Sequence, residues 1–493
     1  MQTKYILTID QGTTSSRAIL FDKKGNTVGK YQMEFTQIRR QSGFVEHNAN
    51  EIYESVLECI RNVINNSGIK VSEIDCLAIT NQRETAVLFD KKTGLPVCDA
   101  ICWQSRQSKS ICDDLIAKGY EEVIFAKTGL HINPYFSASK IRYMLDNNPK
   151  VYEKYQNDEI LFGTIDTYLL YRLSSGKSFY TDHTNASRTL LYNINTHTYD
   201  DELLQIFNIK RSILPEILNT SDYFGKVEIL GEKVPVCALV GDQQASLFGH
   251  CAFNEGDIKN TYGTGCFMLL NMKDKNIRSK HGLLTTIGYV INNEVNYALE
   301  GSVFIAGAAV NWLKDGIKII ESSKETSDRA YKVSEDDVIL VPSFVGMGTP
   351  YWENDARGAI FGMSLQTTQE HLIKATLQGI AYQSKDVLEV MKKEANFDDI
   401  SISVDGGASA NDFLLQFQAD IMQKVIKRPK QIETTALGAC FLAGLYTKFF
   451  KDLNELKKIN QTDKLYYPII DSNKCEKLYS RWLKAVNATR SFK

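Results

Sequence analysis

Several features that would assign the chain to a common protein class are missing from its sequence. The 57 lysines and arginines nearly balance the 59 aspartates and glutamates, for a net charge of −2. No positive field therefore exists to hold a nucleic acid or an anionic membrane. The longest apolar runs, 303–310 and 436–446, contain glycines and are too short for a membrane span. The N-terminus reaches Asp10 before a signal peptide could form. We therefore expect a cytoplasmic protein with a small-molecule partner.

Metal-binding cysteine patterns and the common nucleotide motifs are also absent. Of the ten cysteines, only Cys98 and Cys102 lie close together, with no second pair or nearby histidine to complete a zinc site. The segment 174–178 imitates the end of a Walker A loop, but Tyr171 stands where its first glycine should be. The glycines of 263–265 lack the third glycine of a dinucleotide-binding turn. The missing residues argue against a zinc site, a P-loop and a Rossmann dehydrogenase.

What is present is an alternation of strand and helix signals over 493 residues. This length suggests two domains or three, and the alternation indicates an α/β fold. Both halves contain apolar strands that run into glycine-containing turns, which suggests a duplicated domain. We expect an N-terminal domain over 1–250 and a C-terminal domain over 251–493, divided near 248–255.

The first half shows short strands followed by a helix. Strands are predicted at 4–10, 19–21, 27–32, 76–80 and 85–89. The first three are joined by turns and indicate an antiparallel meander at a sheet edge. Between them and the later strands, apolar residues at helical spacing over 52–64 predict a helix, with Asn48 or Asn50 as its cap and Gly68 at its end.

The second half repeats this organisation. A strand over 237–240 enters the turn 241–244, and 260–271 has the pattern of a hairpin. Thr367 and Glu370 have the spacing of a capping box that opens a helix through about residue 393. A strand over 400–404 is followed by a helix from about Asn411.

The most informative stretch is 10–17, Asp-Gln-Gly-Thr-Thr-Ser-Ser-Arg. An apolar strand delivers Asp10, Gly12 allows a close turn, and hydroxyls and backbone N–H groups can cradle phosphate. Arg17 adds a planar cation suited to phosphate oxygens. Taken alone, this stretch could equally be an ordinary β-turn capped by Asp10. Similar turns at 262–265 and 405–411 make a phosphate-binding function harder to dismiss.

Together with three further segments, the turns 10–17 and 262–267 resemble the FGGY carbohydrate kinases, and within that family the members that act on glycerol. The matching segments are 10–17, 81–85, 241–245, 262–267 and 348–352. The likeness extends from about residue 4 to 446. It implies two actin-like (ribonuclease H-like) domains with a central catalytic cleft, and it also implies a homodimer. ATP with Mg²⁺ would lie mainly on the C-terminal domain and glycerol mainly on the N-terminal one.

The resemblance also implies contact residues for each substrate. Glycerol would contact Arg83, Glu84, Trp103, Tyr135, Asp242, Gln243 and Phe267. ATP would contact Gly12, Thr13, Thr14, Ser15, Arg17, Thr264, Gly307, Asn311, Gly407 and Asn411. Asn311 stands where bacterial members carry glutamine. Members inhibited by fructose 1,6-bisphosphate carry a glycine-rich loop with an arginine before the catalytic aspartate. The stretch 225–233 has no arginine, so this form of feedback is not expected.

The chemistry of phosphoryl transfer assigns roles to the charged residues. We expect Asp242 to act as the general base, with Asp10 and Arg17 as further catalytic groups. Asp10 and Asp242 would hold Mg²⁺ through water. The structural alternatives are a turn cap for Asp10 and a cap of the helix over 244–248 for Asp242.

Arg83 and Glu84 would orient two adjacent hydroxyls, because a guanidinium donates and a carboxylate accepts. The alternative is a solvated ion pair of little energetic value. Trp103, Tyr135 and Phe267 would exclude water from the acceptor, although each alone is more often a core residue.

Two other functions stay open at this stage: an FGGY kinase for a larger sugar such as xylulose, and an actin-like or chaperone-like ATPase.

Overall fold

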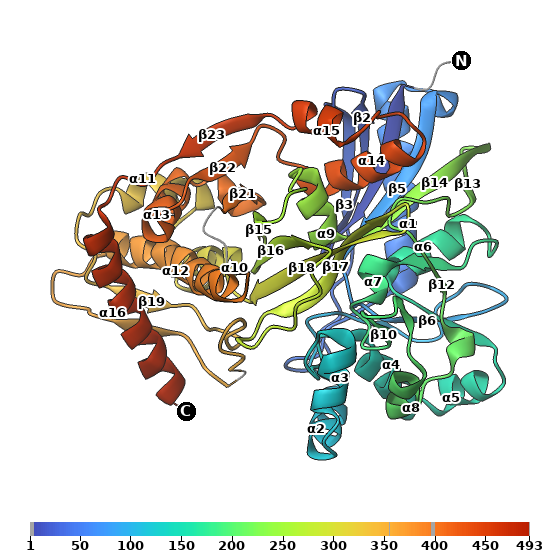
Figure 1. Cartoon of the computed structure of the whole chain (residues 1–493), viewed down its shortest axis with the longest axis horizontal. Helices are drawn as coiled ribbons and strands as arrows, with labels where there is room; N and C mark the ends of the chain where they lie inside the picture. Colours follow the sequence, from blue (N-terminus) through green and yellow to red (C-terminus); the bar gives the residue numbers. More distant parts are fainter. Residues whose placement is uncertain (1–3, 354, 396–399, 493) are drawn as a thin grey trace.

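The computed structural model describes residues 4–353, 355–395 and 400–492, arranged as two halves that each contain a β-sheet (Figure 1). The predicted domain limits at residues 1 and 493 lie outside the described residues. Among the described residues, no helix is both long and apolar enough to cross a bilayer.

The first sheet contains six strands. In spatial order they are β13 (Lys226–Ile229), β14 (Glu232–Gly241), β5 (Ile74–Asn81), β1 (Tyr5–Gln11), β2 (Ser15–Asp22) and β3 (Thr27–Glu34). Strands β1, β2 and β3 form the predicted antiparallel meander at the sheet edge. Strand β2 begins earlier than predicted, because Arg17 pairs in register with Asp10. The turn that follows β1 is therefore shorter than the motif in the sequence.

The second sheet repeats this order with one additional strand. Its strands are β17 (Leu284–Ile291), β18 (Glu294–Val303), β16 (Cys266–Lys273), β15 (Asp257–Tyr262), β21 (Ser401–Asp405), β22 (Ile426–Pro429) and β23 (Thr462–Tyr466). Strand β15 pairs antiparallel with β16 and parallel with β21, as β1 does with β2 and β5. The predicted duplication and the predicted hairpin over 260–271 are both confirmed.

Helices cover both sheets. The helices include α1 (Ala49–Ser67), α6 (Ile165–Leu173), α9 (Asp242–Gly249), α12 (Gln369–Ala395), α13 (Asp412–Met422), α14 (Thr434–Tyr446) and α16 (Ser472–Ser491). Of the two candidate caps for α1, Asn48 accepts hydrogen bonds from the N–H groups of Asn50 and Glu51. Gly68 ends this helix in the left-handed conformation, with φ of 68°.

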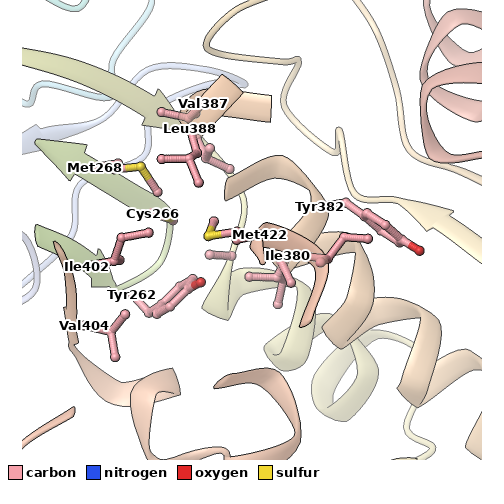
Figure 2. Packing of buried hydrophobic residues seen from close by; sticks show 14 of the residues in the cluster. Tyr262, Cys266, Met268, Ile380, Tyr382, Val387, Leu388, Ile402, Val404 and Met422 are labelled. Carbon is pink, nitrogen blue, oxygen red and sulfur yellow. The ribbon is translucent and has the colours of Figure 1, made fainter. Parts of the chain in front are cut away.

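The core of the second half lies between its sheet and the helices α12 and α13. Figure 2 shows Met268 and Ile402 from the sheet facing Ile380 and Leu388 of α12. The predicted capping box of α12 is wrong, because the helix begins at Gln369, two residues after the expected cap. The hydroxyl of Thr368 instead contacts Nδ1 of His371 at 3.0 Å.

Most of the short helices and two-stranded pairs of the first half lie between β5 and β14 in sequence, and they carry several candidate site residues. The helices are α2 (Lys109–Ala117), α3 (Glu121–Thr128), α4 (Ser137–Asp146), α5 (Pro149–Gln156), α7 (His183–Ala186) and α8 (Asp201–Phe207). The paired strands are β4 (Glu46–His47) with β7 (Ala100–Ile101), β6 (Val87–Asp90) with β8 (Ile160–Gly163), β9 (Tyr180–Asp182) with β12 (Glu216–Leu218), and β10 (Tyr192–Asn193) with β11 (Thr198–Tyr199). The first of these pairs precedes Trp103, and α7 precedes Arg188.

Two helices connect the halves. Helix α14, from the second half of the chain, packs on the first sheet beside β1, β5 and β14 (Figure 1). It crosses α9 at backbone contact distance, since a Cβ added at Gly438 would lie 1.8 Å from the carbonyl oxygen of Ala245. A Cβ at Gly249 would likewise lie 2.0 Å from the carbonyl oxygen of Thr434. Glycine is therefore required at this crossing on both helices.

Candidate active site

Three parallel strands of the first sheet end at the same level. Gln11, Asn81 and Gly241 are register partners at the carboxyl ends of β1, β5 and β14. The three segments that leave these strands therefore meet at one edge, as in other open α/β sheets. The side chain of Gln82 joins two of the segments by donating to Gln11 Oε1 at 3.1 Å and to the carbonyl oxygen of Gly12 at 3.2 Å.

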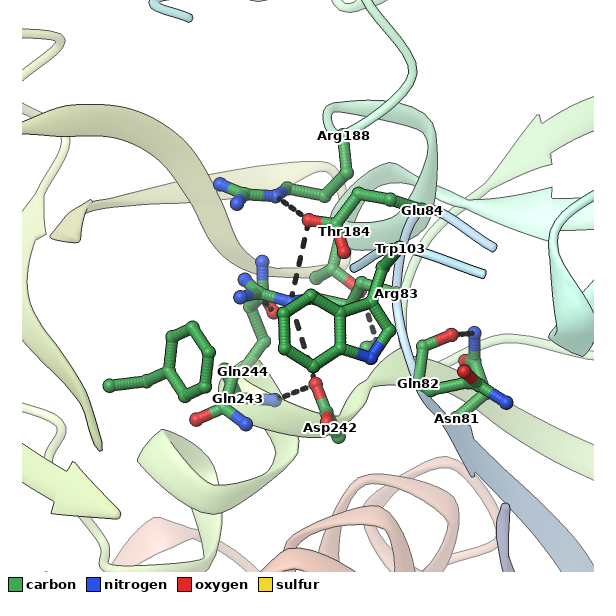
Figure 3. Close-up of polar contacts among 12 residues, drawn as sticks. Asn81, Gln82, Arg83, Glu84, Trp103, Thr184, Arg188, Asp242, Gln243 and Gln244 are labelled. Carbon is green, nitrogen blue, oxygen red and sulfur yellow. Dashed lines mark hydrogen bonds and ion pairs between the residues drawn. The ribbon is translucent and has the colours of Figure 1, made fainter. Parts of the chain in front are cut away.

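Arg83 lies at the centre of this edge, among three carboxylates. Its Nη1 and Nη2 donate to the two oxygens of Glu300 at 2.5 and 3.0 Å. Its Nε lies 3.4 Å from Asp242 Oδ1 and 3.8 Å from Glu84 Oε1 (Figure 3). Burial disfavours the charged carboxylate of Glu300, but Arg188 and Arg83 lower its pKa to about 2.

Glu84 is held next to Arg83 from the other side. Its backbone has φ of 60°, and Oε1 of its side chain accepts a hydrogen bond of 2.6 Å from Nε of Arg188. The side chains of Arg83 and Glu84 are 2% and 1% exposed. The alternative of a solvated surface pair is therefore ruled out. Only a ligand that enters the site could contact these two side chains.

Asp242 is the first residue of α9 and keeps 28% of its side chain exposed. Its Oδ1 accepts a hydrogen bond of 2.7 Å from the N–H of Gln243. Burial raises the pKa of Asp242 to about 6, with the charge of Arg83 opposing the rise. Gly241 occupies the cap position of α9 and makes no side-chain cap. The carboxylate of Asp242 therefore borders the open side of the site, and its pKa lies above the ordinary value of 3.8.

The three predicted aromatic residues lie together. The ring of Trp103 makes edge contacts with Tyr135 at 5.6 Å and with Phe267 at 6.1 Å between ring centroids. Tyr135 also accepts a long hydrogen bond of 3.4 Å from Nη2 of Arg83. Nε1 of Trp103 donates to the hydroxyl of Thr13 at 2.9 Å, so this aromatic wall contacts the turn after β1.

Gln243 has its side-chain orientation fixed by a buried lysine. Nζ of Lys259 donates to Oε1 of Gln243 at 2.5 Å, to the hydroxyl of Thr261 at 3.1 Å and to the carbonyl oxygen of Phe267 at 3.1 Å. An ammonium group can only donate, so the amide oxygen of Gln243 must face Lys259. Burial lowers the pKa of Lys259 to about 8.

The turn after β1 is closed by a hydrogen bond of 2.9 Å from the N–H of Gly12 to the carbonyl oxygen of Ser15. Thr14 is exposed, and Gly12, Thr13 and Ser15 are half-buried. Because the hydroxyl of Thr13 contacts Trp103, the turn lies beside the aromatic wall of the site. The backbone N–H groups and hydroxyls of this turn can cradle phosphate.

Arg17 and Asp10 form an ion pair behind this turn. Nη1 of Arg17 also donates to Oε2 of Glu433 at 3.0 Å, and Lys30 pairs with the same glutamate. Burial raises the pKa of Asp10, while the charge of Arg17 opposes the rise. Both terminal nitrogens of Arg17 thus have carboxylate partners in this structure.

The predicted nucleotide residues of the second half fall into two groups. The N–H groups of Ala306 and Ala308 donate to the carbonyl oxygen of Thr264 at 2.9 and 3.1 Å, and the N–H of Gly307 donates to that of Gly263 at 3.0 Å. The turn after β15 is thereby joined to the short helix α10 (Gly307–Asn311). The side chain of Asn311, at the end of this helix, is exposed.

The second group lies after β21. A Cβ added at Gly407 would meet nothing within 4 Å, so this glycine faces open space. Asn411 caps α13 by accepting from the N–H of Leu414 at 2.9 Å, and its amide donates to the hydroxyl of Thr326 at 2.8 Å. The amide of Asn411 is therefore already used within the protein.

The sequence patterns did not point to several charged residues of the site: Lys30, Arg188, Lys259, Glu300 and Glu433. Glu300 had a recognisable signal, since it is the one charged residue of the segment 295–303 in β18. The others stand in ordinary mixed sequence, and only the fold brings them to the site.

Comparison with known proteins matches the chain to two family models. Residues 5–249 match the N-terminal domain and residues 258–446 the C-terminal domain of the FGGY family of carbohydrate kinases. The chain is 51% identical over 494 residues to the glycerol kinase of Bacillus licheniformis, covering 99% of this chain and 100% of that protein. It is 50% identical to the glycerol kinase of Bacillus subtilis, covering 99% of each.

Solved structures show the same architecture. The structure of Plasmodium falciparum glycerol kinase with ADP has a TM-score of 0.91 at 36% identity, with 99% of both chains covered. A xylulose kinase from Lactobacillus acidophilus has a TM-score of 0.87 at 23% identity, with 99% of both chains covered, which shows the fold alone. Two domain models, close full-length relatives and a duplicated actin-like sheet agree: the chain belongs to the FGGY family of carbohydrate kinases.

Proposed function

We propose that the chain is a glycerol kinase, which transfers the γ-phosphoryl group of ATP to glycerol and gives sn-glycerol 3-phosphate and ADP. The main observation that supports this function is the buried pair of Arg83 and Glu84, which lies beside Asp242 and the aromatic wall. Relatives that match this chain over their full length, at 51% and 50% sequence identity, are named glycerol kinases. These features support a small polyhydroxy acceptor.

In the proposed mechanism, Arg83 donates to one acceptor hydroxyl and Glu84 accepts from its neighbour. Asp242 takes the proton of the attacking hydroxyl as the new O–P bond forms. The amide nitrogen of Gln243 provides a further donor, since its oxygen is taken by Lys259. Trp103 and its aromatic neighbours exclude water, which would otherwise accept the phosphoryl group.

Nucleotide binding is proposed for the turns that face this edge. The turn 12–15 and Arg17 would contact the phosphates of ATP, together with Thr264 and Gly307. Gly407 and Asn411 would border the rest of the nucleotide, and the open space at Gly407 supports this placement. Arg17 would have to exchange part of its pairing with Asp10 and Glu433 for phosphate oxygens.

The residues present also fit a magnesium ion bound through water. Asp10 and Asp242 are close enough for the charge of Asp10 to raise the pKa of Asp242. Carboxylate oxygens and retained waters are the ligands that Mg²⁺ prefers. No group of three metal-binding side chains occurs within the described ranges. When bound, the ion would neutralise charge on the transferred phosphoryl group.

The experiment that tests this function measures ADP release from Mg-ATP with glycerol, with xylulose, with ribulose and without acceptor. Turnover that depends on glycerol is expected. A preference for a larger sugar would assign the chain to another FGGY kinase. ADP release that is independent of every acceptor would favour an actin-like or chaperone-like ATPase.

We further propose that the protein is a cytoplasmic homodimer and that its chain divides into domains near residue 250. Free thiols in all ten cysteines support a reducing compartment. Sedimentation equilibrium should give twice the 55.7 kDa of the chain. A cut by limited proteolysis at the exposed Asn254 would support this division.

A further inference from the structure

Four buried charges around the proposed acceptor site form a closed ring of ion pairs. Glu300 binds both terminal nitrogens of Arg83, and its Oε1 also accepts from Nη2 of Arg188 at 3.0 Å. Nε of Arg188 donates to Glu84 at 2.6 Å, and Glu84 lies 3.8 Å from Nε of Arg83 (Figure 3). None of the four side chains is more than 2% exposed. Two members, Arg83 and Glu84, are the proposed acceptor contacts, and the other two contact them directly.

The ring joins the two halves of the molecule. Glu300 lies on β18 of the second sheet, whereas Arg83 follows β5 of the first sheet. Arg188 follows α7, in the segment that separates β5 from β14. Ser302, two residues beyond Glu300 on β18, donates to Oε1 of Glu300 at 3.2 Å. The orientation of Arg83 therefore depends on the position of the second sheet relative to the first.

Stability alone is a weak reason for this arrangement. Removing charges from water costs several kcal/mol for each ion, and replacing a buried ion network by apolar side chains is often neutral or stabilising. A role in positioning explains the ring better, because each proposed acceptor contact is held at hydrogen-bond distance. Arg83 is held by the carboxylate of Glu300, and Glu84 by the guanidinium of Arg188. Arg188 is further confined by the rings of Tyr135 and Phe136, whose centroids lie 5.5 and 5.2 Å from its guanidinium carbon.

We propose that Glu300 and Arg188 are positioning residues for acceptor selection: Glu300 fixes the guanidinium of Arg83 and Arg188 fixes the carboxylate of Glu84. This inference rests on the proposed glycerol kinase activity. Because Glu300 binds both Nη atoms, Arg83 cannot rotate its fork toward Asp242 and presents a fixed edge to the acceptor. A polyol that places two hydroxyls on Arg83 and Glu84 is then distinguished from an alcohol that lacks one of them.

The test compares wild type with Glu300→Gln, which keeps the shape of the side chain but places an amide NH₂ against a guanidinium. We expect the KM for glycerol to rise about 10- to 100-fold, the range for one lost hydrogen bond to a charged group. The KM for ATP should change less than about twofold. The preference for glycerol over propane-1,2-diol, measured as a ratio of kcat/KM values, should fall by about tenfold or more.

Asp200→Asn is the matched control. Asp200 pairs with Lys127 at 2.8 Å as a largely buried carboxylate and caps α8, a role that asparagine can also fill. This variant should keep both the KM for glycerol and the acceptor preference. A melting temperature for each variant separates lost stability from lost positioning.

Three results would overturn the inference. If Glu300→Gln is less stable but keeps the KM for glycerol and the acceptor preference, the ring is only structural and the inference is overturned. If Glu300→Gln does not fold, Arg188→Lys replaces it, because it keeps the charge but removes the Nε donor to Glu84. An unchanged KM and preference in that variant would also overturn the inference. A wild type that does not phosphorylate glycerol would overturn the proposed function, and this inference with it.

Discussion

Replacing Asp242 by asparagine tests the proposed general base with little change in shape. The Asp242→Asn side chain keeps an oxygen that can accept the hydrogen bond of 2.7 Å from the N–H of Gln243. It cannot, however, take the proton of an attacking hydroxyl. General-base catalysis contributes about 10²- to 10⁴-fold, which corresponds to about 3–5 kcal/mol. We expect kcat to fall within this range while the KM for ATP stays within about threefold.

The pH dependence of the wild type provides a second measurement on the same residue. Burial raises the pKa of Asp242 to about 6 from its ordinary value of 3.8. The charged form is the base, so activity should be present above pH 6 and should fall as the pH drops below it. From pH 7 to pH 5, kcat/KM for glycerol should decrease about tenfold. The residual activity of Asp242→Asn should lack this decrease.

The assay is coupled ADP release with saturating Mg-ATP, and Asp200→Asn again serves as the control carboxylate. Asp242→Asn with more than a tenth of wild-type kcat would refute the role of Asp242 as base. An acidic decrease that persists unchanged in Asp242→Asn would assign the titration to another group.

Three further predictions concern other parts of the molecule. Lys259→Met should free the amide of Gln243 to rotate and raise the KM for glycerol about tenfold, measured by steady-state kinetics; an unchanged KM would remove Lys259 from the site. Gly438→Ala should lower the melting temperature by about 5–10 °C, because the new methyl group would overlap the backbone of Ala245 at the α9–α14 crossing. Calorimetry would contradict this close contact if the melting temperature did not change. Gly407→Ala should leave the melting temperature unchanged, since its methyl group meets open space, but raise the KM for ATP about tenfold; an unchanged KM would place the nucleotide elsewhere.

Local sequence patterns predicted the elements that depend on neighbouring residues. Asn48 and Gly68 bound α1 as expected, and the turns around Gly12 and Gly263 follow apolar strands. Such features are encoded within a few residues, by capping groups, glycines and alternating apolar side chains. The actin-like fold of the two halves followed from the resemblance, and the family models and the solved glycerol kinase structure confirm it.

Contacts between distant segments could not be predicted in this way. Glu300 lies 217 residues from Arg83, and Glu433 lies 416 residues from Arg17. Neither pairing leaves a periodic pattern, because each depends on how the two halves pack. The packing of α14 on the first sheet has the same origin: its apolar sequence indicates burial but not which sheet covers it.

The most direct test of the proposed activity follows the phosphoryl group itself. Phosphorus NMR of a mixture of the protein, Mg-ATP and glycerol identifies every phosphate product, and sn-glycerol-3-phosphate dehydrogenase then reports the stereochemistry. We expect one equivalent of sn-glycerol 3-phosphate for each ADP formed, with no inorganic phosphate. ADP accompanied by inorganic phosphate, or no reaction with glycerol at all, would contradict the assignment of this chain as a glycerol kinase.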